Sequence, residues 1–182
     1  MGADSRHLLA AGTDRKARLF EIASGRCRLE LVGHAQAVTA VALSRDGTRA
    51  LTGSLDHTAR VWDLADGKCL AVFDGHEGRV TAVAFAGRGA LTAGEDGVLR
   101  HWDLETGQER QKLAGHVGEV TAIVPVGEAE QALSAGVDRS VRAWDLAEGT
   151  PRGRAMLPAP GSAPPPRRPW QNQTPCKSSK KI

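Results

Sequence analysis

One segment recurs four times along the chain, and this recurrence constrains the fold more than any other feature. Aligned without gaps, the copies are LLAAGTDRKARLFE from Leu8, ALTGSLDHTARVWD from Ala50, ALTAGEDGVLRHWD from Ala90 and ALSAGVDRSVRAWD from Ala132. A Gly-His pair precedes each of the last three copies, at Gly33-His34, Gly75-His76 and Gly115-His116. The histidines are 42 and 40 residues apart, and the aromatic residues Phe20, Trp62, Trp102 and Trp144 are 42, 40 and 42 apart. Two landmarks that share one period predict a repeat protein.

Within one period the pattern is that of short strands. Residues 38–44 alternate in the period of two that is typical of a half-buried strand, and residues 45–48 (Arg-Asp-Gly-Thr) predict a hairpin turn. Further strands are expected at residues 49–53, 58–62 and 68–73, separated by turns at residues 55–57 and 66–67. Four short antiparallel strands about every 40 residues, without a helix, predict one propeller blade for each complete repeat.

The Gly-His and Trp-Asp dipeptides at this distance, with an Asp turn between them, resemble the WD-repeat family over about residues 8–150. The resemblance implies an all-β, partial β-propeller with three complete four-stranded antiparallel blades and one truncated blade. The expected divisions are a truncated N-terminal blade with strands b, c and d at residues 1–32, three WD-repeat blades at 33–157, and a Pro-rich, basic, disordered tail at 158–182.

The same resemblance implies that a hydrogen-bonded tetrad of His, Ser or Thr, Asp and Trp holds each blade together. The matching residues are His34, Thr52, Asp56 and Trp62, then His76, Thr92, Asp96 and Trp102, then His116, Ser134, Asp138 and Trp144. The hydroxyl is expected at Thr52 and not at Ser54, because the counterparts of Ser54 are Gly94 and Gly136. A buried polar group needs a partner, and such a network would supply one.

A hydroxyl, a His and an Asp also make up a hydrolase triad, and this interpretation competes with the structural one. The trio occurs three times, always with a Trp, whereas a catalytic site is built once, so the structural interpretation is favoured and no enzyme is expected. The six histidines form no H-x-x-x-H or H-E-x-x-H pair, and no phosphate-binding glycine motif occurs. We therefore expect neither a metal nor a cofactor.

The first and last repeats depart from this pattern. The first has Ala10 at the hydroxyl position, Phe20 for Trp and Glu21 for Asp, and it keeps Asp14 but lacks a Gly-His pair and its own first strand. After the last repeat, one more strand is expected around Arg152 to Met156. Four arginines stand two positions before the aromatic residues, and we interpret them as solvated residues of an outer-edge strand; they are Arg18, Arg60, Arg100 and Arg142.

Three blades and a part do not close a ring, since propellers typically have 4–8 blades. Both ends of an open arc would expose apolar surface. We therefore expect a fragment or shortened form of a longer propeller, or a chain that self-associates, and a product that is marginally stable or oligomeric.

The charge and composition of the chain bear on its partners and its location. Residues 151–182 carry seven Lys or Arg and no acid, whereas the remainder has 17 basic and 21 acidic residues. The basic character therefore belongs to the tail, and nucleic-acid binding is expected only weakly, through that tail. No stretch approaches the ~20 apolar residues of a membrane helix, and no secretory signal or cysteine pair typical of a disulfide framework occurs. An intracellular location, cytoplasmic or nuclear, is expected.

The leading functional hypothesis is a non-catalytic scaffold that binds other proteins or peptides through its loops. Candidate loop residues are Gln36, Leu55, His57, Glu77, Glu95, Glu119 and Arg139. Two alternatives stay open: a regulatory or sensor region of a larger multidomain protein, and a subunit of a ribonucleoprotein assembly. Salt-dependent RNA binding that is lost on deleting residues 151–182 would favour the last.

Overall fold

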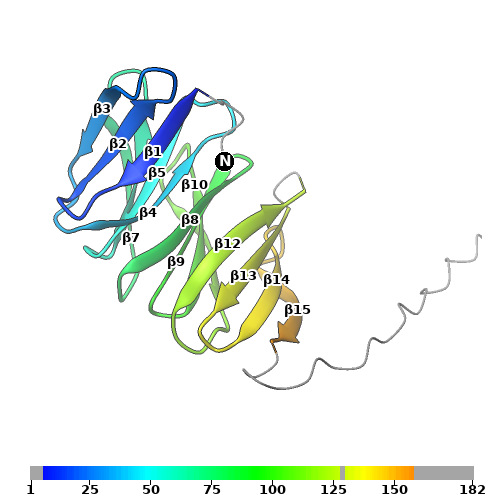
Figure 1. Cartoon of the computed structure of the whole chain (residues 1–182). Coiled ribbons are helices and arrows are strands. Elements are labelled where there is room, and N and C mark those ends of the chain that lie inside the picture. Colours follow the sequence, from blue (N-terminus) through cyan, green and yellow to red (C-terminus); the bar gives the residue numbers. More distant parts are fainter. Residues whose placement is uncertain (1–5, 128–129, 158–182) are drawn as a thin grey trace, which may run out of the picture.

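The computed structural model describes residues 6–127 and 130–157, which contain fifteen β-strands and no helix (Figure 1). The first sheet contains β1 (His7–Ala11), β2 (Lys16–Glu21) and β3 (Cys27–Val32). The second contains β4 (Val38–Leu43), β5 (Arg49–Ser54), β6 (Thr58–Asp63) and β7 (Cys69–Asp74). The third contains β8 (Val80–Ala86), β9 (Gly89–Gly94), β10 (Val98–Asp103) and β11 (Glu109–Ala114). The fourth contains β12 (Val120–Val126), β13 (Gln131–Gly136), β14 (Ser140–Asp145) and β15 (Thr150–Met156).

In every sheet each strand pairs antiparallel with the next strand in sequence. The turns before the last strand of each sheet place a glycine at positive φ, which this residue adopts without a steric penalty; these are Gly25, Gly67, Gly107 and Gly149. The described part of the chain offers no helix long and apolar enough to cross a membrane.

The expected all-β partial propeller, with three complete blades and one incomplete blade, is confirmed. In the first sheet β1, β2 and β3 occupy the places of the second, third and fourth strands of the other sheets. The strand expected around Arg152 to Met156 is β15. The tail expected at 158–182 lies outside the described residues.

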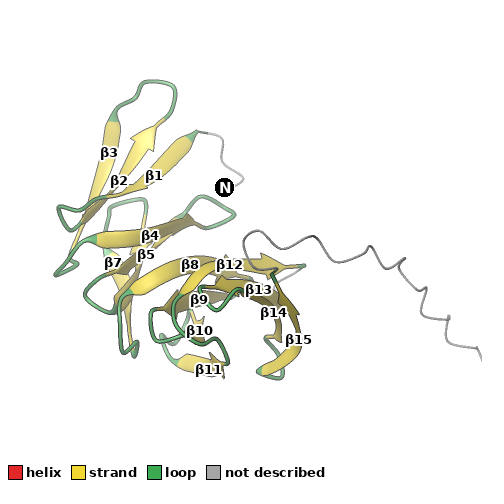
Figure 2. Cartoon of the chain, turned by 60° about the horizontal axis from the view of Figure 1, so that its bottom comes forward, coloured by secondary structure: helices red, strands yellow, loops and turns green. Residues whose placement is uncertain are grey.

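Neighbouring sheets pack face to face in chain order, so that the first and fourth sheets lie at the ends of an arc (Figure 2). We call the surface that a sheet turns toward the following sheet its forward face, and the opposite surface its backward face. Forward-face residues of the second sheet and backward-face residues of the third form one apolar core, made by Leu51, Ala59, Val61 and Phe73 with Ala90 and Trp102. The same arrangement recurs at the junctions on either side.

The first strands of the complete sheets, β4, β8 and β12, lie side by side and are joined by threonine hydroxyls. Thr39 of β4 donates to the carbonyl oxygen of Val80 in β8, and Thr81 of β8 donates to that of Val120 in β12. Thr121, at the same position of β12, donates only within its own sheet among the described residues, to the Ala135 oxygen at 3.2 Å. Apolar packing is thus supplemented by a threonine hydrogen bond between the second and third sheets and by another between the third and fourth sheets.

Removing one of these bonds should weaken the chain, and Thr121 provides the matched control. Thr81→Val deletes a hydrogen bond between two sheets and should lower the free energy of unfolding by about 1 kcal/mol. Thr121→Val removes the same atoms without breaking a contact between sheets, so its effect should be clearly smaller. Urea unfolding followed by circular dichroism measures both, and equal losses would contradict the role assigned to Thr81.

Candidate functional site

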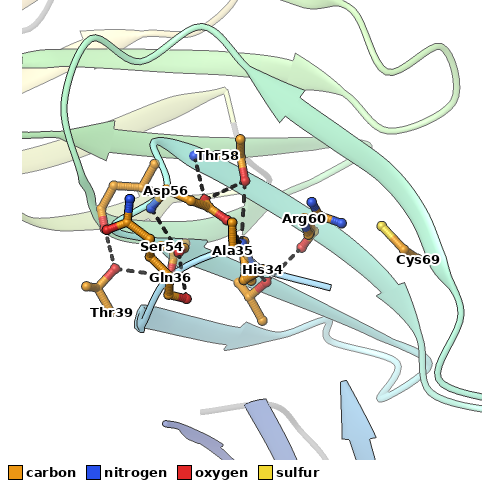
Figure 3. Close-up of polar contacts among 12 residues, drawn as sticks. His34, Ala35, Gln36, Thr39, Ser54, Asp56, Thr58, Arg60 and Cys69 are labelled. Atoms are coloured by element: carbon orange, nitrogen blue, oxygen red, sulfur yellow. Dashed lines mark hydrogen bonds and ion pairs between the residues drawn. The ribbon is translucent and has the colours of Figure 1, made fainter. Parts of the chain in front are cut away.

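In the second sheet the four residues of the expected tetrad form one continuous chain of hydrogen bonds. The indole Nε1 of Trp62 donates to the hydroxyl oxygen of Thr52 at 2.8 Å. That hydroxyl lies 2.7 Å from Nε2 of His34, whose Nδ1 lies 2.9 Å from a carboxylate oxygen of Asp56 (Figure 3). With the proton of His34 on Nδ1, every step has one donor and one acceptor: indole to hydroxyl, hydroxyl to imidazole, imidazole to carboxylate.

The third and fourth sheets repeat this arrangement. In the third sheet the bonds join Trp102 to Thr92 at 2.9 Å, Thr92 to His76 at 2.7 Å, and His76 to Asp96 at 3.0 Å. In the fourth they join Trp144 to Ser134 at 2.8 Å, Ser134 to His116 at 2.7 Å, and His116 to Asp138 at 3.0 Å. The structure thus brings all twelve residues together as three separate tetrads.

The carboxylate of Asp56 joins the tetrad to the backbone of two loops. It accepts the amide of Ala35 at 2.8 Å, in the loop after Gly33, and the amide of Thr58 at 3.0 Å, where β6 begins. Burial alone would raise the pKa of Asp56. The hydrogen bonds from Thr58, His34 and Ala35 outweigh burial and hold that pKa well below its ordinary value.

The four arginines before the aromatic residues are not solvated edge residues, so this expectation was wrong. They lie on β2, β6, β10 and β14, each of which has a paired strand on both sides. Arg100 is 3% exposed, and its guanidinium lies 3.3 Å from Glu109 and 3.5 Å from Asp96. Because Arg100 and Trp102 are two positions apart on one strand, both point toward the same face of the sheet.

These side chains lie close to the glycine that precedes the tetrad histidine in the second and fourth sheets. A Cβ atom on Gly33 would lie 3.0 Å from both the Arg60 guanidinium and the Trp62 ring. On Gly115 it would lie 2.8 Å from Arg142 and 3.1 Å from Trp144. In these two sheets the loop therefore passes close over the ring and the guanidinium, which would have to shift to admit a side chain. At Gly75 a Cβ atom would be in ordinary contact, 3.4 Å from Trp102 and 3.6 Å from Arg100.

The burial of the tetrads opposes the hydrolase interpretation. Thr52 and Thr92 are 0% exposed and Ser134 is 2% exposed, so no substrate reaches these hydroxyls in the folded chain. Each hydroxyl oxygen also accepts an indole N–H, a bond that a catalytic nucleophile would not need. What the arrangement does chemically is satisfy buried polar groups.

Other chemistry would require clustered metal ligands or reactive thiols within residues 6–127 and 130–157. No three His, Cys, Asp or Glu side chains in these ranges gather as metal ligands would. Cys27 and Cys69 are free, exposed thiols, and Cys176 lies outside the described residues. The first sheet, which lacks the tetrad, instead pairs Arg18 with Asp14 and Glu30 near the surface.

The candidate binding residues lie at the end of the sheets where the Gly-His loops meet the Asp turns, and we call this surface the loop face. Hydrogen bonds join the two segments in each complete sheet, for example from the Leu55 amide to the Ala37 oxygen. Two of the candidates are half-buried, Leu55 and Glu119. The others are exposed: Gln36, His57, Glu77, Glu95 and Arg139.

Arg79 is a loop-face residue that the sequence interpretation missed. Its guanidinium lies 2.9 Å from Glu119, which belongs to the neighbouring sheet, and 3.8 Å from Glu95. Arg79 and Glu119 occupy the same position in consecutive repeats, directly before the first strand. Opposite charges at one repeat position were the signal that could have revealed this pair.

Deleting the hydroxyl of a tetrad should cost more than deleting one beside it. Thr52→Val leaves the Trp62 indole and Nε2 of His34 buried without partners, and should lower the free energy of unfolding by about 3 kcal/mol. Thr58→Val introduces the residue that the third sheet has at this position, Val98, and should cost about 1 kcal/mol. Urea titration tests both. Thr52→Ser keeps the hydroxyl and should therefore retain most of the stability that Thr52→Val loses. Equal costs for the two valine variants would disprove the role of Thr52.

Acid should destabilise the chain through two buried histidines. Burial lowers the pKa of His34 and of His101 below 6.5, and Nδ1 of His101 has no hydrogen-bond partner among the described residues. Below pH 6.5 the unfolded chain binds more protons, so this part of the stability is complete above that pH and falls as the pH falls. His101→Val, which copies Val61 of the second sheet, should raise the free energy of unfolding by about 1 kcal/mol at pH 7 and flatten its decrease between pH 6.5 and 5. Unfolding titrations at several pH values test this, and an unchanged slope would contradict it.

Comparison with known families agrees with this geometry. The family model described as "WD domain, G-beta repeat" matches residues 25–63, 67–103 and 107–145. Each match begins before the last strand of one sheet and ends with the third strand of the next. A comparison with curated proteins finds no match to the chain. Three matches in succession, over more than half of the sequence and over all three tetrads, show that this chain belongs to the WD-repeat (WD40) family.

Proposed function

We propose that this chain is a non-catalytic scaffold that binds other proteins or peptides through its loop face. WD repeats generally mediate protein interactions, and membership of this family therefore supports binding to other proteins. The finer assignment, to the loop face, rests on how the tetrads hold the loops.

The observation that carries the proposal is the double attachment of Asp56, which fixes the backbone of the Gly-His loop and of the Asp turn at once. The tetrads repeat, but the neighbouring turn positions differ between repeats. One such position is Leu55, Glu95 and Val137, and another is His57, Gly97 and Arg139. A fixed loop backbone with varied exposed side chains is the arrangement that recognition surfaces use.

Two of these turn residues hold a backbone conformation that side chains seldom adopt. His57 has φ 69° and Arg139 has φ 59°, where the third sheet has Gly97 at φ 74°. A non-glycine residue in this region costs of order 1 kcal/mol. The chain thus keeps an exposed imidazole and an exposed guanidinium on the loop face at some cost in stability, which supports a role in contact with a partner.

The charges of the loop face favour a polypeptide partner over a nucleic acid. Exposed carboxylates of Glu77 and Glu95 lie on the same surface as the exposed Arg139. Carboxylates repel a phosphate backbone, whereas a mixture of charges and polar groups suits the rim of a protein interface.

Matched charge reversals at the two ends of the third sheet test the proposal. Glu95 lies on the loop face and Glu105 in the turn before β11, at the opposite end, and both are exposed. Proteins that bind the wild-type chain in a cell extract can be captured by cross-linking and quantified. The recovered amount of these proteins should fall about fivefold with Glu95→Lys. Glu105→Lys should retain them. Equal recovery with both variants, or a loss with Glu105→Lys alone, would contradict binding through the loop face.

A further inference from the structure

The internal junctions between sheets are all built from the same two kinds of surface. At the junction between the second and third sheets, the forward face contributes Leu51 and Phe73, and the backward face contributes Ala90 and Trp102. The rings of Phe73 and Trp102 stack with their centroids 4.8 Å apart and an angle of 6° between their planes. Each junction therefore joins a forward half to a backward half that differs from it in shape and composition.

The fourth sheet exposes a forward face that no described residue covers. Leu133 occupies the position of Leu51 and Leu91, which are both 0% exposed, yet Leu133 is 40% exposed. Val124 occupies the position of Ala42 and Ala84 and is 56% exposed. The fourth sheet thus ends in the apolar half of a junction.

The first sheet exposes the complementary backward face. Leu8 and Ile22 are each 57% exposed, whereas Ala50 and Leu64, at the same positions of the second sheet, are 0% and 6% exposed. Phe20, at the position of the tetrad Trp, is half-buried. Leu8, Phe20 and Ile22 line an open hollow of about 370 Å³ together with Glu21 and Gly25.

We propose that these two faces bind each other between copies of this chain, so that the fourth sheet of one copy packs head to tail on the first sheet of a second copy. Such a contact would continue the internal junctions, because Leu133 and Val141 of one copy correspond to forward-face residues, and Phe20 and Ile22 of the other to backward-face residues. Head-to-tail contacts form a closed ring when the rotations that relate successive copies add up to a full turn. Two copies contain eight sheets, which lies within the usual size of a propeller. This contact is independent of the loop face and its proposed function.

The proposed junction is smaller than the internal ones. Among the described residues, the first sheet has no strand at the place of β4, β8 and β12, so the contact would involve only second to fourth strands. Val80 and Val120, which accept bonds from Thr39 and Thr81, have no counterpart in the first sheet. Apolar contact must therefore hold the junction, and Thr121→Val should leave the association unchanged.

A second copy suits the open face better than residues 158–182 of the same chain. These residues include seven prolines, each lacking the N–H that a strand ladder requires, and few large apolar side chains. A second copy instead presents three large apolar side chains on a preformed sheet.

Variants that each block one face test the head-to-tail contact. At tens of micromolar, light scattering should give the wild-type chain twice its monomer mass of 19.2 kDa. Ile22→Glu blocks the first-sheet face and Leu133→Glu the fourth-sheet face, so each variant alone should dissociate at least tenfold more readily. Mixed together, they retain one intact junction and should form a 1:1 dimer, which native mass spectrometry identifies when one variant carries ¹⁵N.

Leu70→Glu is the matched control, because Leu70 is 51% exposed on the outer strand of a sheet that has a neighbour on both sides. This variant should associate as the wild type does, and circular dichroism should show all variants folded. A monomeric wild-type chain would overturn the proposal. So would a dimer that survives Ile22→Glu, or a mixture of the two blocked variants that stays monomeric, because both results exclude a head-to-tail contact.

Discussion

The indole N–H of a tetrad Trp has no access to water, and each complete sheet depends on how this one donor is satisfied. Its acceptor must also donate a hydrogen bond to the imidazole, which a Ser or Thr hydroxyl does and an apolar residue of the same size cannot. The imidazole then carries the bond outward to a carboxylate such as Asp56, which ends the chain of bonds at two loop amides. Removing the hydroxyl leaves the indole N–H and the imidazole Nε2 buried without this partner, which is costly because both groups have been taken out of water. One polar chain thus determines both the packing of a sheet and the course of its loops.

Much of the fold follows from the sequence because the landmarks are local. The segment from His34 to Trp62 includes two turns and three strands. The alternation of residues 38–44 indicates which of its side chains face inward. The arginines were misjudged because a single strand does not reveal its neighbours. Arg60 resembles an edge residue until β7 is placed outside β6. Its guanidinium and the Trp62 ring then both lie close to Gly33 of the Gly-His loop.

Contacts between sheets are the part that the sequence could not supply. Leu51, Leu91 and Leu133 stand at one position of the repeat and are preceded by the same residue, yet only the first two are buried. Whether such a side chain is covered depends on what lies against its sheet, which is not encoded within the repeat itself. The ion pair of Arg79 with Glu119 is similar, since neither residue indicates its partner until two sheets are placed together.

The offset between repeat and sheet has a consequence for how the arc comes apart. A matched repeat such as residues 25–63 supplies the outermost strand of one sheet and three strands of the next, so no sheet lies within a single matched repeat. Loss of one repeat therefore damages two sheets, and disorder in one spreads to its neighbour through the backbone as well as through side-chain packing. Because the backbone itself joins each sheet to the next, we expect unfolding to be more cooperative than contacts between neighbouring sheets alone would make it.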